Sequence, residues 1–401
     1  MKRILFLYLL LAASITATAQ KVKVLNANFG IIYPFSTNGV HAPNDTNHLS
    51  LHLISGVSAK ETGFALSGIT NVILQEASGM ELAGFSNHVK GHVQGMQLAG
   101  FLNTAGSVNG VQVAGFSNIT KQESGIQVSG FFNHATDAMV QTAGFLNMGR
   151  DICAVQAAGF GNVGRDVNAT QAAGFFNLGR NVNGVQAAGF VNIGKNINGA
   201  QAAGFCNVAT DVNGAQVAGF VNKARKVKGA QVAGFINVAD SSDYPIALVN
   251  IIKNGTQSIG ITVDESATTL VAFRSGGKYL YGILGAGYNF QETSDLYAGE
   301  AGLGAHLFTI KHFQLNAETV LTSLTDFKNG AYLRSSIRIL PTLHFADRFD
   351  LFGGVSFNHV YTTLHKDDVP KTDYIWSDQE SGHFNGLYIG GIVGIQCRIN
   401  R

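Results

Sequence analysis

The chain has 401 residues, of which 49 are glycine and five are proline. Only 13% are charged, and the formal net charge is +2 at pH 7. An apolar content of 46% excludes an intrinsically disordered chain. The sparse, nearly balanced charge argues against a nucleic-acid partner, because such a partner usually requires a dense basic surface.

The first residues have the pattern of an export signal. Lys2 and Arg3 supply a positive start, the apolar stretch 4–13 follows, and residues 17–19 read Ala-Thr-Ala, an A-x-A cleavage site. We therefore assign residues 1–19 to a signal peptide. No later stretch reaches the ~18 continuous apolar residues of a membrane helix. Any membrane contact is thus expected to come through β-structure.

One pattern of about fifteen residues recurs between residues 61 and 255. It reads G-V/A-Q-V/A-A-G-F-x-N, then four variable residues, a Val or Ile, and an Asn. The Gly of the A-G-F step recurs from Gly84 to Gly234 at spacings of 14 to 16 residues. Degenerate copies near Gly68 and at 245–252 flank the array, as expected for terminal caps. Residues 20–60 are assigned to N-terminal capping strands.

The repeat length restricts the fold. Fifteen residues are too few for a membrane hairpin, which requires more than ~20, and too few for a two-helix repeat of ~33 residues. A composition of Gly, Val, Ile and Phe favours strand over helix. The array therefore predicts an all-β architecture that begins with a parallel β-solenoid of about 11–13 coils, stacked ~4.8 Å apart.

Stacked coils place identical side chains above one another, so the repeat predicts three columns. Amides in register can hydrogen-bond along the stack, and the Phe rings can stack on each other. We expect the Phe column inside, because a large exposed apolar stripe promotes aggregation; the alternative is an exposed stripe. The central members of these ladders are Gln156, Gln171, Gln186, Gln201, Phe160, Phe175, Phe190, Phe205, Asn162, Asn177, Asn192 and Asn207.

A fourth column is basic. Arg150, Arg165, Arg180 and Lys195 each stand three residues after the repeat Asn, and Asp or Asn follows each of them. Stacked cations repel unless they are paired or bind an anion. One interpretation is a groove for an anionic glycan or lipopolysaccharide. The simpler interpretation is a solvated turn edge that neighbouring Asp residues neutralise.

The array resembles the leptospiral-type surface repeat proteins of bacteria. Their repeats read like G-x-Q-x-A-G-hydrophobic-x-N, as "NGVQAAGFVN" does here, and the likeness extends to the lead-in at 31–56. The resemblance implies a cell-surface or outer-membrane location and no assigned enzymatic activity. Phe stands where Leu or Ile is common in that family, and we expect this difference to alter packing only.

After about residue 256, alternation of apolar and polar residues replaces the repeat. Apolar-out and polar-in at a period of two predicts a small antiparallel membrane barrel of about eight strands; the alternative is a soluble β-sandwich with one wet face. The polar segment 364–383 is long while the turns at 276–278 and 346–348 are short, as in outer-membrane barrels. The candidate strands lie near 257–264, 268–276, 279–290, 295–308, 313–325, 330–345, 349–363 and 384–399.

Charged residues occupy inward positions of these strands. An eight-stranded barrel is filled by its own side chains, and buried charges require partners. Glu300 and Glu318 are therefore expected to form lumen ion pairs with Arg334 and Arg338.

Signatures of catalysis are missing from the sequence. It contains no P-loop, nucleophile elbow or zinc-ligand spacing. Cys153, Cys206 and Cys397 are an odd, scattered set that predicts no disulfide framework. We expect no enzyme activity, no catalytic residue, no cofactor and no metal.

The leading hypothesis is a structural or interaction protein of a bacterial cell envelope, exported to the outer membrane and the cell surface, with its solenoid attached to the barrel. The periplasm is the alternative location. Candidate partners are the outer membrane and an envelope glycan or another surface protein. A soluble exported binding module is the first alternative. A polysaccharide-acting β-helix enzyme is the second, and it would require clustered carboxylates on one face; the repeats supply only Asp151, Asp166 and Asp211 in one turn column.

Overall fold

A computed structural model describes residues 24–291, 296–327, 332–345, 348–363, 372–380 and 383–399. The predicted signal peptide lies outside these ranges, as do residues 364–371 and 381–382 of the long polar segment. The chain divides into two compact units, one that ends at Arg150 and one that begins at Asp151. In the part of the chain with described structure, no helix is long and apolar enough to cross a membrane.

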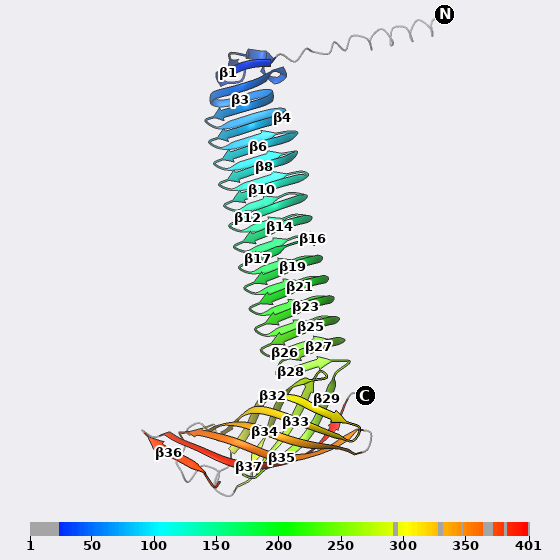
Figure 1. The fold of residues 1–401 in the computed structure, drawn as a ribbon. Helices are drawn as coiled ribbons and strands as arrows, with labels where there is room; N and C mark the ends of the chain where they lie inside the picture. The colour runs from blue at the N-terminus through cyan, green and yellow to red at the C-terminus, as the bar shows by residue number, and fades with distance from the viewer. Residues whose placement is uncertain are drawn as a thin grey trace, which may run out of the picture. The chain divides into compact units, whose positions relative to one another are not determined.

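The first unit consists of stacked parallel strands that alternate between long and short (Figure 1). β1 (Val24–Ile32) pairs in parallel with β3 (Thr46–Ser67), and β3 pairs with β4 (Thr70–Ala83). Between them lie β2 (Phe35–Ser36) and the 3-10 helix η1 (Gly39–Asn44). Long strands then pair with long and short with short. They are β5 (Ser86–Val89), β6 (His92–Ala99), β7 (Leu102–Ala105), β8 (Ser107–Ala114), β9 (Ser117–Thr120), β10 (Glu123–Ser129), β11 (Phe132–His134), β12 (Asp137–Ala143) and β13 (Leu146–Met148).

The second unit begins with coils of the same kind. Each strand pairs in parallel with its equivalent one repeat later, in register from Gln to Gln and from Asn to Asn. The predicted β-solenoid is therefore confirmed, with about 13 turns over both units. Its strands here are β14 (Asp151–Ala158), β15 (Gly161–Val163), β16 (Asp166–Val167), β17 (Thr170–Ala173), β18 (Phe176–Leu178), β19 (Asn181–Ala188), β20 (Val191–Ile193), β21 (Asn196–Ala203), β22 (Cys206–Val208), β23 (Asp211–Ala218), β24 (Val221–Lys223), β25 (Lys226–Ala233), β26 (Ile236–Ala239), β27 (Ser241–Ile246) and β28 (Val249–Ile252).

Each coil contains three straight segments separated by bends, as the coil at 181–195 illustrates. The first bend is at Gly184, whose φ of +151° disfavours any residue with a Cβ. The second is at 189–190 and the third at 194–195. Each segment points one side chain fully inward: Val182, Gln186 and Asn192 are at most 1% exposed. The core of a coil is therefore one apolar and two amide side chains.

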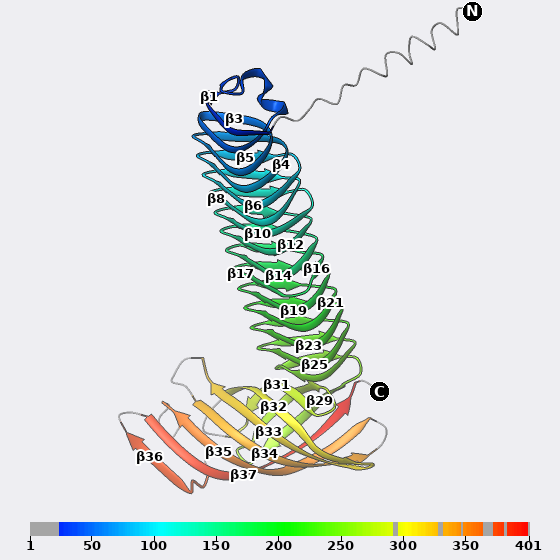
Figure 2. The ribbon, with the colours of Figure 1, turned by 45° about the horizontal axis from the view of Figure 1, so that its top comes forward.

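The rest of the second unit is a closed antiparallel barrel (Figure 2). Eight strands pair in sequence, and β29 pairs with β37 to close the ring, so the barrel form of the prediction is confirmed and the sandwich does not form. A ninth strand, β36, pairs with the start of β37. The strands are β29 (Thr256–Asp264), β30 (Thr268–Gly276), β31 (Leu280–Asn289), β32 (Leu296–Ile310), β33 (Phe313–Thr325), β34 (Tyr332–Phe345), β35 (Phe349–Thr362), β36 (Trp376–Glu380) and β37 (His383–Arg398).

The last solenoid coil packs against one rim of the barrel. The Asn250 backbone N–H donates to Ser275 Oγ at 2.8 Å, and its side-chain Nδ2 donates to the Ser275 carbonyl at 3.0 Å. A Cβ on Gly282 would overlap the backbone of Ala247 and Leu248, so only glycine allows this contact. At this rim the strand connections 277–279, 311–312 and 346–348 are short. At the opposite rim, 290–295, 326–331 and 363–382 are longer, and only 265–267 is short.

Candidate functional site

The outer surface of the barrel is predominantly apolar, with exposed polar exceptions that include Thr319, Ser335 and His359. No charged residue of β29–β35 or β37 is exposed; all of them point inward or are partly buried. The sequence predicted that apolar outward and polar inward residues alternate along each strand. β34 shows this alternation, since Ile337 is 60% exposed and the neighbouring Arg338 is 2% exposed. The large outward side chains, each at least 40% exposed, include Ile259, Ile261, Val271, Leu303, Leu321, Ile337, Val355, Phe357, Ile389 and Val393.

Exposed aromatic side chains mark both ends of this apolar surface. Near the rim with long connections, Tyr297 and Phe327 are in contact, with ring centroids 5.4 Å apart. Near the rim beside the solenoid, Phe345 and Phe349 lie 6.1 Å apart. Two aromatic girdles around an apolar band are typical of barrels that span a membrane. Further exposed aromatics are Phe290, Tyr361 and Trp376 at the first rim and Tyr279 and Phe308 at the second.

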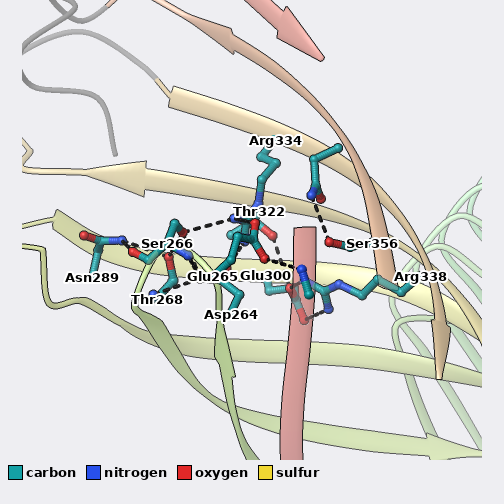
Figure 3. A network of polar contacts seen from close by, with 12 residues as sticks. Asp264, Glu265, Ser266, Thr268, Asn289, Glu300, Thr322, Arg334, Arg338 and Ser356 are labelled. Carbon is teal, nitrogen blue, oxygen red and sulfur yellow. Dashed lines mark hydrogen bonds and ion pairs between the residues drawn. The ribbon is translucent and has the colours of Figure 1, made fainter. Parts of the chain in front are cut away.

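Ion pairs cross the barrel interior (Figure 3). The Arg338 guanidinium donates to both Glu300 carboxylate oxygens, at 3.1 and 2.6 Å. Arg334 donates to Asp264 at 2.5 Å, and Arg274 donates to Glu318 at 2.9 Å. Each guanidinium thus has its own carboxylate, which buried charges require.

Two of these pairings differ from the prediction. Arg338 does pair with Glu300 and also lies 3.7 Å from Glu318. Arg334, however, is paired with Asp264, at the far end of β29, and Glu318 is paired with Arg274 of β30. The strand order explains both: closure brings β29 and β30 across the lumen from β33 and β34. Alternation in β30 could have marked Arg274, because it shares the inward face with Leu270 and Ala272.

The barrel interior is filled at one end and hollow at the other. Towards the long connections, a buried apolar cluster includes Leu270, Leu296, Leu324 and Val360. Beside the solenoid, a cavity of about 460 Å³ is lined by polar groups of the barrel and by Asn254 of the last coil. In between lie the ion pairs. The described side chains therefore form a plugged barrel.

The interior of the solenoid contains the two predicted amide ladders. Gln186 Nε2 donates to Gln171 Oε1 at 2.8 Å, and the bond repeats from coil to coil at 2.7 to 3.1 Å along the second unit. Asn192 Nδ2 donates to Asn207 Oδ1 at 3.0 Å and to the Ala202 carbonyl at 2.7 Å. All of these amides are 0% exposed. Each one finds its hydrogen-bond partner in the equivalent amide of the next coil, as buried polar groups require.

The Phe column lies outside, and the expectation that it is buried was wrong. Phe190 is 41% exposed, and its ring stacks on that of Phe205 with centroids 4.9 Å apart and planes within 3°. The strand ends at Ala188, and the bend at 189–190 resets the alternation that would have put Phe on the side of Gln186. The neighbouring outward positions are apolar too, with Ile193 42% exposed.

Two of the four cations of the basic column are paired with neighbouring acids. In the first unit Arg150 Nη2 lies 3.1 Å from Asp137, and in the second Arg165 Nε lies 2.8 Å from Asp166. The hydrogen bond from Arg165, with a further one from Asn181, lowers the pKa of Asp166. Arg180 and Lys195 are exposed.

This arrangement favours a solvated turn edge over an anion-binding groove. The shallow cavity of about 600 Å³ nearby is lined by Asp211, Arg225, Lys226 and Lys228 among several Asn residues, so its lining is net positive. Asp211 is paired with Arg225. None of the four residues of the predicted basic column lines this cavity, so it is not a groove formed by that column.

Two buried glutamates in the first unit were missed by the sequence analysis. Glu61 is 3% exposed and accepts hydrogen bonds from Asn47 and Ser50 at 3.1 and 2.7 Å. Glu81 is 1% exposed and pairs in register with Gln97, so it occupies the Gln column. Burial, and then the charge of Glu61, raise the pKa of Glu81 to about 8. The stretch "GMELAGFSN" shows this substitution directly in the repeat.

Comparison with family models, with curated proteins and with solved structures found no match in any of the three. The resemblance to leptospiral-type surface repeat proteins therefore stays a prediction. Over the ranges given above, no group of three or more His, Cys, Asp and Glu side chains is placed to hold a metal ion. Cys153 is exposed, whereas Cys206 and Cys397 are partly buried, and all three are free thiols.

Proposed function

We propose that this protein is a non-enzymatic anchor of the bacterial outer membrane, whose barrel spans the membrane and whose solenoid extends into the periplasm as an interaction surface. The observation that carries the proposal is the exterior of the barrel. Eight strands present mainly apolar side chains outward and expose no Asp, Glu, Lys or Arg among their described residues. A barrel surrounded by water has no reason for that distribution, whereas hydrocarbon requires it.

The lengths of the strand connections support the periplasmic side. Outer-membrane barrels have short periplasmic turns and longer extracellular loops. All three connections at the rim that contacts the last solenoid coil are short, whereas three of the four at the other rim are longer, the exception being 265–267. Among the two locations left open by the sequence, this asymmetry favours the periplasm over the cell surface for the solenoid.

The plugged interior supports an anchor in place of a pore. Ion pairs and an apolar cluster occupy the lumen between the two rims. A solute would have to break buried ion pairs to pass, which is strongly unfavourable.

Membrane extraction tests the anchor. The protein should stay in the outer-membrane fraction after a sodium carbonate wash and should migrate faster in gels when it is not boiled, as folded barrels do. Trypsin added to intact cells should spare the basic stretch 223–228, and trypsin added after permeabilisation should cut there. Release by carbonate would contradict the membrane barrel, and cleavage in intact cells would move the solenoid to the surface.

A further inference from the structure

One face of the solenoid in the second unit is almost entirely apolar, and we call it the apolar face. It consists of three columns of positions that follow the second bend of each coil; the middle column is half-buried, and its Gly161 is buried. The first is the Phe column itself, 37 to 43% exposed. The columns are Phe160, Phe175, Phe190, Phe205, Phe220 and Phe235; then Gly161, Phe176, Val191, Cys206, Val221 and Ile236; then Val163, Leu178, Ile193, Val208, Lys223 and Val238.

Another edge of each coil is polar, so the solenoid has one apolar and one polar side. Outward positions before the first bend carry Asn168, Asn183, Asn198 and Asn213, which hydrogen-bond to each other in pairs at 2.8 and 2.9 Å. The apolar face carries a single charge, Lys223. A continuous apolar surface of several hundred Å² on a protein that works in water marks an interaction site.

The ring geometry argues against a glycan on this face. Sugars stack on the open faces of aromatic rings. Here each Phe ring lies against the next with planes within 1 to 11° and centroids 4.9 to 5.3 Å apart. The faces of the inner rings are therefore covered by their neighbours, and only ring edges point outward. A flat surface of ring edges and aliphatic side chains favours contact with another flat apolar surface.

We propose that the apolar face is the surface on which a second copy of this chain packs, with the two solenoids parallel. A surface that repeats every coil is complementary to its own copy, because both have the same spacing. Two chains anchored in one membrane also point the same way, a step that rests on the proposed function. A two-fold axis along the solenoids, centred on the face, then brings the middle column to its own copy and the Phe column opposite the third column of the partner.

The available area is close to the lower limit for a specific contact. Six coils spaced ~4.8 Å apart, with about five residues of ~3.3 Å across the face, give roughly 450 Å² per chain in the second unit. Two chains would bury about 900 Å² there, close to the ~1,000 Å² expected of a specific interface.

Native cysteines provide a matched pair of reporters. Cys206 lies on the apolar face, whereas Cys153 lies in the column of Asn168 and Asn183 on the polar edge. We would compare two full-length variants purified in detergent micelles. The first carries Cys153→Ser and Cys397→Ser, and the second carries Cys206→Ser and Cys397→Ser. A mild oxidant or a short bis-maleimide should join two copies through Cys206 and leave Cys153 unjoined.

The mass of the particle, measured by light scattering, completes the test. The wild type should have the mass of two chains, and Leu178→Glu with Ile193→Glu should have the mass of one. The control Asn168→Glu with Asn183→Glu should remain a dimer, and unchanged β-sheet circular dichroism should show that both fold. A monomeric wild type that resists carbonate extraction would overturn this proposal alone. A dimer joined through Cys153 would overturn the assigned face, and a carbonate-soluble dimer would instead overturn the membrane anchor.

Discussion

The solenoid and the barrel both have polar interiors, but they satisfy them in different ways. In the solenoid each buried amide binds the same amide of the next coil, as Gln186 binds Gln171 at 2.8 Å. In the barrel each buried charge requires a different partner, as Arg338 requires Glu300. A repeated polar core is therefore specified by one position in the repeat, whereas the barrel core depends on pairs of unrelated positions. The first should tolerate local change better than the second.

The largest effect is expected from breaking a barrel ion pair. Arg338→Met leaves Glu300 buried without its guanidinium, and this should lower the free energy of unfolding by about 3–5 kcal/mol. Urea unfolding in detergent, followed by gel mobility, measures the change. Arg338→Met combined with Glu300→Gln should recover much of the loss, since no charge is then left unpaired. Equal losses for the single and double variants would show that the charge pairing does not stabilise the barrel.

A charge on the outside of the barrel tests whether that surface faces hydrocarbon, unlike the water-exposed surface of the solenoid. Ile337 is 60% exposed in the middle of the apolar band. Ile337→Arg should destabilise the barrel in lipid vesicles by about 2–4 kcal/mol, as for charges near the membrane midplane. Ile337→Ala controls for the loss of the side chain and should have a smaller effect. A barrel surrounded by water would accept the arginine without measurable loss, and that result would contradict the membrane assignment.

Within the solenoid, the inner and outer columns should respond differently. Asn192→Ala removes hydrogen bonds to Asn177, Asn207 and the Ala202 carbonyl and should reduce stability by roughly 2–3 kcal/mol. Phe190→Ala removes a half-exposed ring and should reduce it by only about 1 kcal/mol. Thermal unfolding of the purified protein measures both. The reverse order would mean that the Phe stack, and not the amide ladder, holds the coils together.

The buried Glu81 provides a pH-dependent test of the ladder. Its pKa is raised to about 8, chiefly by burial, so ionisation is more difficult in the folded chain than in the unfolded chain. Its contribution to stability is therefore complete below the unfolded value of ~4.5 and is lost as the pH rises towards 8. Glu81→Gln should remove this loss and stabilise the first unit by up to about 4 kcal/mol at pH 8. At pH 4 the wild type and Glu81→Gln should have the same free energy of unfolding. A difference that stays constant across the pH range would exclude the carboxylate as its cause.

Much of the fold follows from the sequence because both regions are periodic. The Gln and Asn ladders need only the repeat length, and the eight barrel strands need only the period of two. The Phe column was misplaced because alternation holds only within a straight strand, and the bend at Gly189 is not visible in the period. Arg334 was given the wrong partner because Asp264 lies 70 residues away in the chain and approaches only when the barrel closes. Which strands face each other across the lumen depends on the order of all eight strands in the closed barrel. The alternation within a single strand does not contain that information.

The side of the membrane on which each region lies is the central claim, and one labelling measurement tests it directly. A membrane-impermeant maleimide would be applied to intact cells that carry either Cys153 as the sole cysteine or Asp378→Cys in a chain with all three native cysteines replaced by Ser. Cys153 is an exposed solenoid residue, and Asp378 is exposed on β36 at the rim with long connections. The account predicts that the cysteine introduced at position 378 is labelled in intact cells and that Cys153 is labelled only after permeabilisation. Labelling of Cys153 in intact cells, with position 378 protected, would contradict it.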